Sequence, residues 1–255
     1  MAEKLQLGVA GGKVLLDGSV DASTDSLNIH TVAQLQGVRI SDLFYTFDNF
    51  DQRFLIDSHL SGKVFSDIDL TMQADKKGNM RWEALNADIY FRIVEGGLHN
   101  FDPLQKLAKY ANKEHLANLR FSELKNRILI KNKIIYIPPM EVHADPTRIR
   151  LSGTHTFDGK LNYSFRVPLE LLQQQEGEMT SEGEDTAAGP HLFFKLQGDI
   201  NRYKISHDVE ATRKSLAKAL KVQGKEALKA LIRGASRRDK RLQELALDDY
   251  FDFDE

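Results

Sequence analysis

The stretch RIRLSGTHTFDGKLNYSFRVPL, which runs from Arg148 to Leu169, decides the fold class. Asp158 and Gly159 in its middle form a dipeptide that is a strong signal for a tight turn between two strands. Beyond this turn apolar residues alternate with polar ones, at Leu161, Tyr163, Phe165 and Val167. Because successive side chains of a strand point to opposite faces, the stretch is predicted to be a β-hairpin with one apolar face.

The same period of two recurs along most of the chain, in residues 64–74, 80–93, 127–144 and 191–211. Pro138 and Pro139 have no N–H to donate to a neighbouring strand, so a bend or a sheet edge is expected there. Sheets with one apolar face have to cover that face. The expected fold is therefore mainly β, an extended antiparallel sheet that curves into a groove or partial tube.

Two short helices are expected to interrupt the strands, at residues 41–50 and 102–119. The second is well marked, because Asp102 can cap its first turn and Pro103 suits the first helical position. The preceding pair Gly96-Gly97 permits a sharp exit from a strand. A helix this short is marginal alone, so we expect it to pack on the sheet and to plug or cover one opening.

The composition excludes several kinds of site. The 255 residues include no cysteine, so disulfides, thiolate metal sites and a cysteine nucleophile are excluded together. The formal net charge of −2 gives no overall field that would attract nucleic acid. The chain shows no secretory signal and no apolar run of membrane-spanning length, and it begins inside a strand-like alternation. We therefore expect it to be part of a longer protein.

No catalytic or metal-binding motif stands out. The eight histidines include no HExxH pair, and the sequence has no G-x-S-x-G, P-loop or dinucleotide fingerprint. Asp67 and Asp69 share a strand face, but exposed carboxylates on a sheet are ordinarily solvated. The sequence therefore predicts no enzyme, no metal and no cofactor.

The C-terminal part changes in composition. Residues 1–210 are interpreted as one β domain, within which the acidic residues 173–190 form a disordered surface loop. Residues 211–241 have apolar residues at helical spacing and predict a basic amphipathic helix, and residues 242–255 are interpreted as an acidic disordered tail. The cations that could contact a membrane or a partner are Lys214, Lys218, Lys221, Lys225, Lys229, Arg233 and Arg237.

Three interpretations of the basic helix remain open. It can lie on an anionic membrane surface, bind a partner, or close the sheet with its cations solvated. Nucleic acid is not expected as a partner, because the basic residues come without interleaved aromatic ones.

The order of several elements resembles the C-terminal region of the AsmA family, bacterial envelope proteins related in architecture to TamB. The resemblance is carried by LNADIYFRIVEGGLHNFDPLQKLAKY from Leu85, by HLANLRFSELKNRILIKNKIIYIPPMEVHA from His115, and by the hairpin from Arg148. The flanking HLSGKVFSDIDLTMQAD and HLFFKLQGDI are similar to that family's pattern. This chain departs from the family in lacking its N-terminal membrane anchor and its long preceding β region.

The resemblance implies a long sheet rolled into an incomplete tube in the periplasm, anchored in the inner membrane within a longer parent chain. It also implies that the protein binds phospholipid and supports phospholipid transport to the outer membrane, or the integrity of that membrane. The alternative is a periplasmic scaffold with a solid core, which contacts envelope proteins during outer-membrane protein assembly.

An acyl chain can lie inside a rolled sheet that is wider than its own side chains fill, gaining roughly 0.8 kcal/mol for each buried methylene. Ordinary core packing is the alternative for every residue of such a groove. The groove candidates are Ile68, Leu70, Met72, Ile89, Phe91, Leu161, Tyr163, Phe165 and Phe194.

Overall fold

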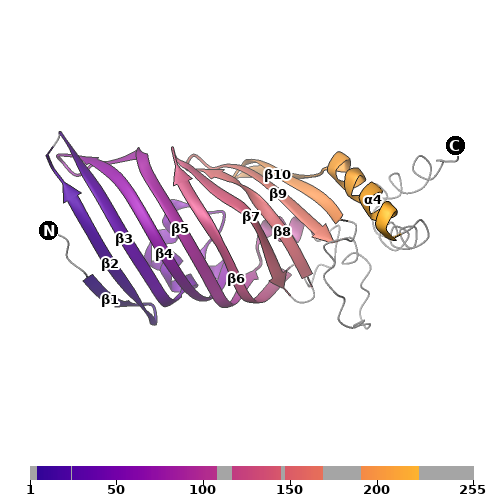
Figure 1. Ribbon diagram of the computed structural model, residues 1–255, viewed down its shortest axis with the longest axis horizontal. Helices are drawn as coiled ribbons and strands as arrows, with labels where there is room; N and C mark the ends of the chain where they lie inside the picture. The colour runs from indigo at the N-terminus through magenta and orange to yellow at the C-terminus, as the bar shows by residue number, and fades with distance from the viewer. Residues whose placement is uncertain (1–4, 24, 108–116, 145–146, 169–190, 224–255) are drawn as a thin grey trace.

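The computed structural model describes residues 5–23, 25–107, 117–144, 147–168 and 191–223. Its strands form one antiparallel sheet in which each strand pairs with its neighbours in sequence, from β1 to β11 (Figure 1). The sheet is not closed, and β1 and β11 are its two edge strands. The prediction of a mainly β fold, an extended curved sheet with a few short helices, is confirmed.

The two longest strands of the sheet are β4 and β5. The strands are β1 (Leu5–Val9), β2 (Gly12–Asp21), β3 (Ser26–Arg39), β4 (Leu60–Asp75), β5 (Met80–His99), β6 (Asn118–Lys131), β7 (Ile134–Ala144), β8 (Thr147–Thr156), β9 (Lys160–Pro168), β10 (His191–Asp199) and β11 (Arg202–His207).

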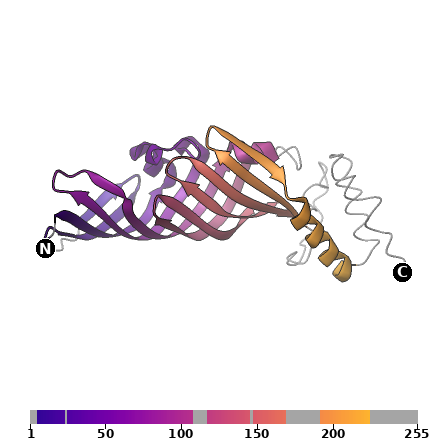
Figure 2. The same cartoon turned by 90° about the horizontal axis from the view of Figure 1, so that it is seen from above.

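The strand connections alternate between two edges of the sheet, which we call the lips. The first lip, at the top of Figure 1, holds the short turns after β2, β4, β6, β8 and β10. The second lip holds residues 40–59, after β3, and the described residues 100–107, after β5. The strands bend around the long axis of the molecule, so the sheet forms a trough with a lip on each side of its open seam (Figure 2).

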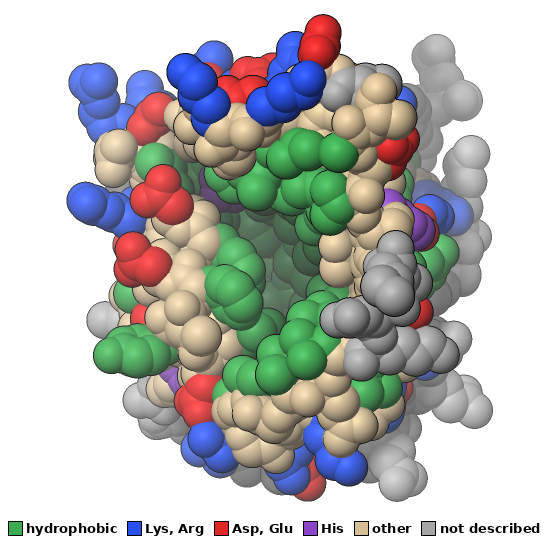
Figure 3. Space-filling model, turned by 90° about the vertical axis from the view of Figure 1, so that its left-hand side faces the viewer, with side chains coloured by type: hydrophobic (Ala, Val, Ile, Leu, Met, Phe, Trp, Pro, Cys, Tyr) green, Lys and Arg blue, Asp and Glu red, His purple; other side chains and the backbone are tan. Residues whose placement is uncertain are grey.

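The inner face of the trough is apolar because apolar residues meet in register across the strands. Ile68 of β4 lies opposite Ala33 of β3 and Ile89 of β5, and Ile89 in turn lies opposite Ile128 of β6. Turning this face inward removes its apolar surface from water, which stabilises the curved form of the sheet. Seen from the N-terminal end, hydrophobic side chains line a hollow (Figure 3).

Pro138 and Pro139 bend β7, as the sequence predicts. The register of β7 against β8 shifts between Ile137 and Met140, and its ladder with β6 is interrupted at the same place. The Asn126 side-chain amide donates a hydrogen bond to the Pro138 carbonyl across this gap at 3.0 Å. A side chain thus bridges the strands where the prolines have no N–H to offer.

The helical segments of the second lip lie on the concave side of the sheet (Figure 2). They are α1 (Ile40–Thr46), η1 (Asp48–Asp51), η2 (Asp57–His59) and α2 (Asp102–Leu107). The helix predicted at residues 41–50 forms as α1 but stops at Thr46. The four residues of η1 all have positive φ, so the chain turns there instead of continuing the helix.

The helix predicted at residues 102–119 is wrong at its C-terminal end. As described, α2 ends at Leu107, residues 108–116 lie outside the described residues, and Asn118 begins β6. Leu119 pairs with Leu98 and is only 4% exposed. A single inward leucine fits a helix and a strand equally well, and pairing with β5 decides in favour of the strand.

Gly96 and Gly97 do not form an exit from the strand, as expected from the sequence, but lie inside β5 opposite Phe121 and Arg120. A Cβ atom on Gly96 would lie 2.2 Å from the Phe121 ring. Glycine is therefore needed at this position so that the ring can pack against the backbone of the neighbouring strand.

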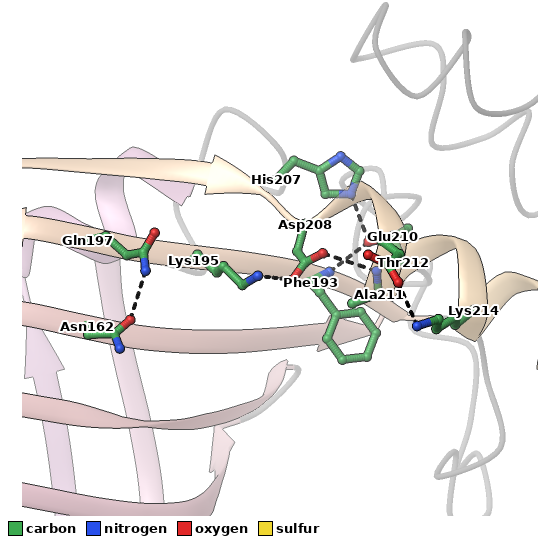
Figure 4. Close-up of polar contacts among 10 residues, drawn as sticks. All are labelled: Asn162, Phe193, Lys195, Gln197, His207, Asp208, Glu210, Ala211, Thr212 and Lys214. Carbon is green, nitrogen blue, oxygen red and sulfur yellow. Dashed lines mark hydrogen bonds and ion pairs between the residues drawn. The ribbon is translucent and has the colours of Figure 1, made fainter.

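Polar contacts fix α4 (Val209–Gln223) to the end of the sheet (Figure 4). The Asp208 carboxylate caps the helix by accepting from the Ala211 N–H at 3.1 Å, and it pairs with Lys195 at 2.7 Å. The Thr212 hydroxyl, which is fully buried, accepts from the Phe193 N–H of β10 at 3.1 Å. These bonds join the first turn of α4 to β10.

The described helix begins two residues before the predicted residue 211 and is followed to residue 223. The rest of the predicted helix to residue 241, the predicted loop at residues 173–190 and the predicted tail at residues 242–255 lie outside the described residues. No helix among the residues that the structure describes is long and apolar enough to cross a membrane.

Candidate functional site

The groove candidates all lie on the inner face of the trough, but the structure separates them into two groups. Those on β9 and β10 have exposed fractions of 2–6%, and they are Leu161, Tyr163, Phe165 and Phe194. Those on β4 and β5 are only half-buried, and they are Ile68, Leu70, Met72, Ile89 and Phe91. The first group belongs to a packed core, which we call the core half of the trough. The second group leaves apolar surface accessible on the inner face, in the part that we call the open half.

The core half is closed because the second lip folds over it. The Phe54 ring, between η1 and η2, lies 6.0 Å from the Tyr163 ring of β9 and 6.0 Å from the Tyr203 ring of β11. Phe101, just before α2, packs edge-on against Phe54 at 5.1 Å. His155 of β8 completes the cluster at 5.8 Å from Phe54. We call residues 52–59 and 101–107 the lid.

Asp102 and Tyr203 hold the lid to the opposite side of the seam. The Tyr203 hydroxyl donates a hydrogen bond to the Asp102 carboxylate, which also pairs with Lys106 at 2.7 Å. The Lys106 Nζ lies 4.1 Å from the centroid of the Tyr203 ring, close enough for a cation–π contact. These contacts bring α2 to β11, an edge strand of the sheet.

The charges of this contact follow from its surroundings. Burial, with the hydrogen bond to Asp102 as the next cause, raises the pKa of Tyr203 to about 12. Burial alone would raise the pKa of Asp102, but the hydrogen bonds from Lys106 and Tyr203 outweigh it and lower that pKa. At neutral pH the contact therefore joins a neutral phenol, a carboxylate and an ammonium group.

The open half offers accessible apolar surface and few polar groups in need of a partner. Leu35, Ser66, Phe91 and Asn126 form one inward-facing row across β3 to β6. The hollow of about 670 Å³ at this row is lined mainly by outward-facing side chains of the two flanking rows, such as Asp67, Arg92 and Arg127, so it does not measure the trough. The inward Ser66 hydroxyl in this row donates to the Tyr90 carbonyl at 2.7 Å, and the inward Asn126 amide donates to Pro138. Because backbone carbonyls accept from both side chains, neither of these inward polar groups lacks a partner.

The described part of the basic helix packs its apolar residues on the sheet. Leu216 and Ala219 are buried in the main core, whereas Lys214 and Lys218 are exposed. Lys214 pairs with Glu210 at 2.7 Å. This is the arrangement of the third interpretation, in which the helix closes the sheet. Lys221 lies on α4, and the other candidate cations lie outside the described residues, at Lys225, Lys229, Arg233 and Arg237.

The helix at Asp102 was expected to cover an opening, but Phe54, Phe101 and Tyr203 are candidates that the sequence analysis did not single out. Phe54 and Phe101 come from different connections, and Tyr203 comes from a late strand, so no local pattern joins them. One signal was available in LFYTFDNFDQRFLI, residues 43–56, which is too rich in aromatic and aliphatic residues for a solvated connection. It indicates that this connection is buried, but it does not indicate against what.

Within the described ranges no group of three or more His, Asp or Glu side chains is placed to hold a metal ion. Comparison with protein-family models, with curated proteins and with solved structures finds no match to this chain.

Proposed function

We propose that the open half of the trough binds the acyl chains of phospholipids. The observation that carries the proposal is a contrast among the groove candidates of one apolar face, which are half-buried on β4 and β5 and packed on β9 and β10. Accessible apolar surface inside a hollow is where an apolar ligand gains most, roughly 0.8 kcal/mol for each buried methylene. The side chains that the ligand would contact are Ile68, Leu70, Met72, Ile89 and Phe91.

The lid limits how a chain lies in the trough. Phe54 and Phe101 fill the space above β8 and β9, so a ligand in the open half meets packed aromatic rings at its inner end. Entry is then from the N-terminal end or across the open seam. This geometry favours holding or shielding an acyl chain over passing it through the described domain from end to end.

The wider role that we propose is to support phospholipid transport to the outer membrane, or the integrity of that membrane. The protein would act in the periplasm as part of a longer chain anchored in the inner membrane. This step rests on the resemblance to the AsmA family together with the open apolar trough. The proposal involves no catalytic step.

The second candidate function is a periplasmic scaffold for outer-membrane protein assembly. It is favoured by the packing of the core half, where Leu192 is 1% exposed and Leu196 is fully buried. On this reading the open half would be covered by a protein partner. Mass spectrometry of lipids extracted from the purified protein separates the two candidates. Lipid binding predicts that phospholipid is found and that it is lost when a charged residue replaces Leu70. The scaffold predicts that no phospholipid is found.

A further inference from the structure

Three hairpin tips on the first lip are tied into one platform. Phe157, in the β8–β9 turn, donates its backbone N–H to the Lys133 carbonyl of the β6–β7 turn at 2.9 Å. The Lys133 ammonium pairs with Glu83 at the start of β5. The neighbouring Trp82 ring meets the Phe157 ring edge-on, with 6.3 Å between centroids. The position of the two rings is therefore set by contacts between three separate turns.

The platform leaves large apolar side chains in water. Trp82 is 50% exposed, Met80 43% and Phe157 41%. Tyr136, the third residue of β7, is 39% exposed and shares an outer-face row with Leu129 and Asp88. We call these four residues the aromatic lip. Single apolar residues scattered over a surface need no explanation, but these side chains are held together by contacts between turns. Such a cluster indicates a surface that another molecule covers.

At Met80 the aromatic lip continues the apolar inner face of the trough. Met80 pairs with Ala74 of β4, which is buried on the inner face at 1% exposed. The next residues along β5 that face inward include Leu85 and Ala87, which are both buried. An apolar path therefore leads from the lip into the trough without crossing a charged position of β5.

Cations surround the aromatic lip. Residues 75–83, 131–136 and 156–160 carry six Lys or Arg against three carboxylates. Three of the lysines are paired, Lys76 with Asp25, Lys133 with Glu83 and Lys160 with Asp158. The other three cations form no ion pair with any residue that the structure describes, and they are Lys77, Arg81 and Lys131.

One connection of the second lip, at residues 40–57, has the opposite charge. Its exposed aromatic residues Tyr45, Phe47 and Phe50 lie in residues 40–57, which carry four Asp and a single Arg. An anionic surface would be repelled there and attracted at the first lip. Aromatic rings with lysines beside them are the combination that favours the interface of an anionic bilayer, where the rings enter the headgroup region and the cations meet phosphate.

We propose that the aromatic lip docks on the surface of a bilayer that contains anionic phospholipid, and that this contact presents the open seam of the trough to the membrane. The inference deepens the proposed function and rests on it, because docking places the apolar path of β5 where an acyl chain could leave the bilayer. Trp82 and Phe157 enter the interface, and Lys77, Arg81 and Lys131 face the headgroups.

Trp82 reports on this contact directly, because it is the single tryptophan of the chain. The experiment mixes the protein with vesicles of phosphatidylethanolamine and phosphatidylglycerol, with and without bromine on the acyl chains. Docking predicts that Trp82 emission shifts to shorter wavelength and that the brominated lipid quenches most of it. The protein should also sediment with the vesicles, less so as salt is added or phosphatidylglycerol is left out.

Substitutions locate the contact. Phe157→Ser and the pair Lys77→Glu with Lys131→Glu should each reduce sedimentation severalfold. The matched control is Val32→Ser, which also removes an exposed apolar side chain, but on the outer face of β3 at 40% exposed. It should sediment like the unchanged protein, as should Phe47→Ser on the second lip.

The outcomes separate docking from lipid binding in the trough. The Leu70→Glu protein should lose the lipid bound in its trough and still dock on vesicles. Its Trp82 emission should therefore still be quenched by the brominated lipid. The inference is overturned if Trp82 emission is unchanged on vesicles, or if Phe47→Ser abolishes sedimentation and Phe157→Ser does not. If phospholipid is extracted from the purified protein in that case, the proposed function stands without this docking surface.

Discussion

The Tyr203 hydroxyl donates a hydrogen bond to the carboxylate of Asp102, although the two residues are 101 positions apart in the chain. One comes from β11, an edge strand of the sheet, and the other begins α2, which follows β5. The bond holds the lid across the seam, and with the aromatic rings beneath it this contact divides the trough into a closed half and an open half.

Removing the Tyr203 hydroxyl should loosen the lid without unfolding the sheet. In Tyr203→Phe the ring can keep its contacts with Phe54 and Lys106, but Asp102 loses a hydrogen bond, a change of about 0.5–1.5 kcal/mol. Amide hydrogen exchange should become faster in residues 102–107 and stay unchanged in β9 and β10. Equal protection of α2 in both proteins would show that the bond does not hold the lid.

Alkaline pH should destabilise the protein through two tyrosines. Burial raises the pKa of Tyr163 to about 12, and burial with the Asp102 bond raises that of Tyr203 to about 12, from an ordinary value of 10.0. A raised folded-state pKa contributes stability that is present below pH 10 and is lost as the pH rises toward 12.

Thermal unfolding followed between pH 8 and pH 11.5 measures this loss. The double variant Tyr163→Phe with Tyr203→Phe should lose less stability over that range than the unchanged protein, because other ionising groups contribute equally to both. Parallel pH profiles would mean that neither phenol is held neutral by the fold.

Loss of the Thr212 hydroxyl should destabilise the contact between α4 and the end of the sheet. Its buried hydroxyl accepts from the Phe193 N–H and is 2.8 Å from the His207 Nε2 (Figure 4). Thr212→Val keeps the shape and leaves the Phe193 donor unsatisfied, which should lower the free energy of unfolding in urea by about 1–3 kcal/mol. Thr212→Ser keeps the hydroxyl and should recover most of the loss. A valine variant as stable as the serine variant would rule out this role.

Gly96 should tolerate no side chain. The Cβ of Gly96→Ala would clash with the Phe121 ring, and such overpacking costs about 1–3 kcal/mol. Gly8→Ala is the control, because a Cβ there has no heavy atom within 4 Å. Adding Phe121→Leu to Gly96→Ala should recover stability in urea unfolding if the ring is the cause. Strictly additive effects of the two substitutions would place the cause elsewhere.

The strands could be predicted from the sequence because their signal is local. Alternation and turn residues, such as Asp158-Gly159, act within a few positions, and Pro138-Pro139 marks its bend by lacking donors. The extent of the second helix could not be read in this way, because Leu119 fits both periods and is assigned by its pairing with Leu98.

The division of the trough was also beyond the sequence. Leu70 of β4 and Phe165 of β9 occupy equivalent inward positions in similar alternations, and nothing near either residue tells which one becomes buried. Burial depends on what lies above them, and that is set by Phe54 and Phe101 from distant connections. The sequence could therefore indicate an apolar inner face but not which part of it stays accessible.

For the aromatic connection at residues 43–56, the sequence could not predict which of its apolar side chains are buried. Its apolar content indicates burial, yet Tyr45 is 76% exposed while Phe54 enters the core cluster. The run of positive φ values from Asp48 to Asp51 turns the chain between them. Asp and Asn adopt such values more often than most residues, but Phe50 belongs to a type that rarely does, so the sequence does not predict the whole run.

The central claim is that the open half of the apolar inner face binds acyl chains, whereas the core half packs the interior of the fold. A charged residue placed in each half tests this claim. Leu70→Glu puts a carboxylate in the open half, Thr71→Glu puts it on the adjacent, exposed outer position of β4, and Phe194→Glu puts it in the core half. The measurement is the amount of phospholipid, by mass spectrometry, extracted per protein molecule, with circular dichroism to check the sheet.

The account predicts that Leu70→Glu keeps the β spectrum and loses its lipid, that Thr71→Glu keeps both, and that Phe194→Glu loses the fold. The account would be contradicted by a folded Leu70→Glu protein that carries as much phospholipid as the Thr71→Glu protein, or by the absence of phospholipid from the unchanged protein.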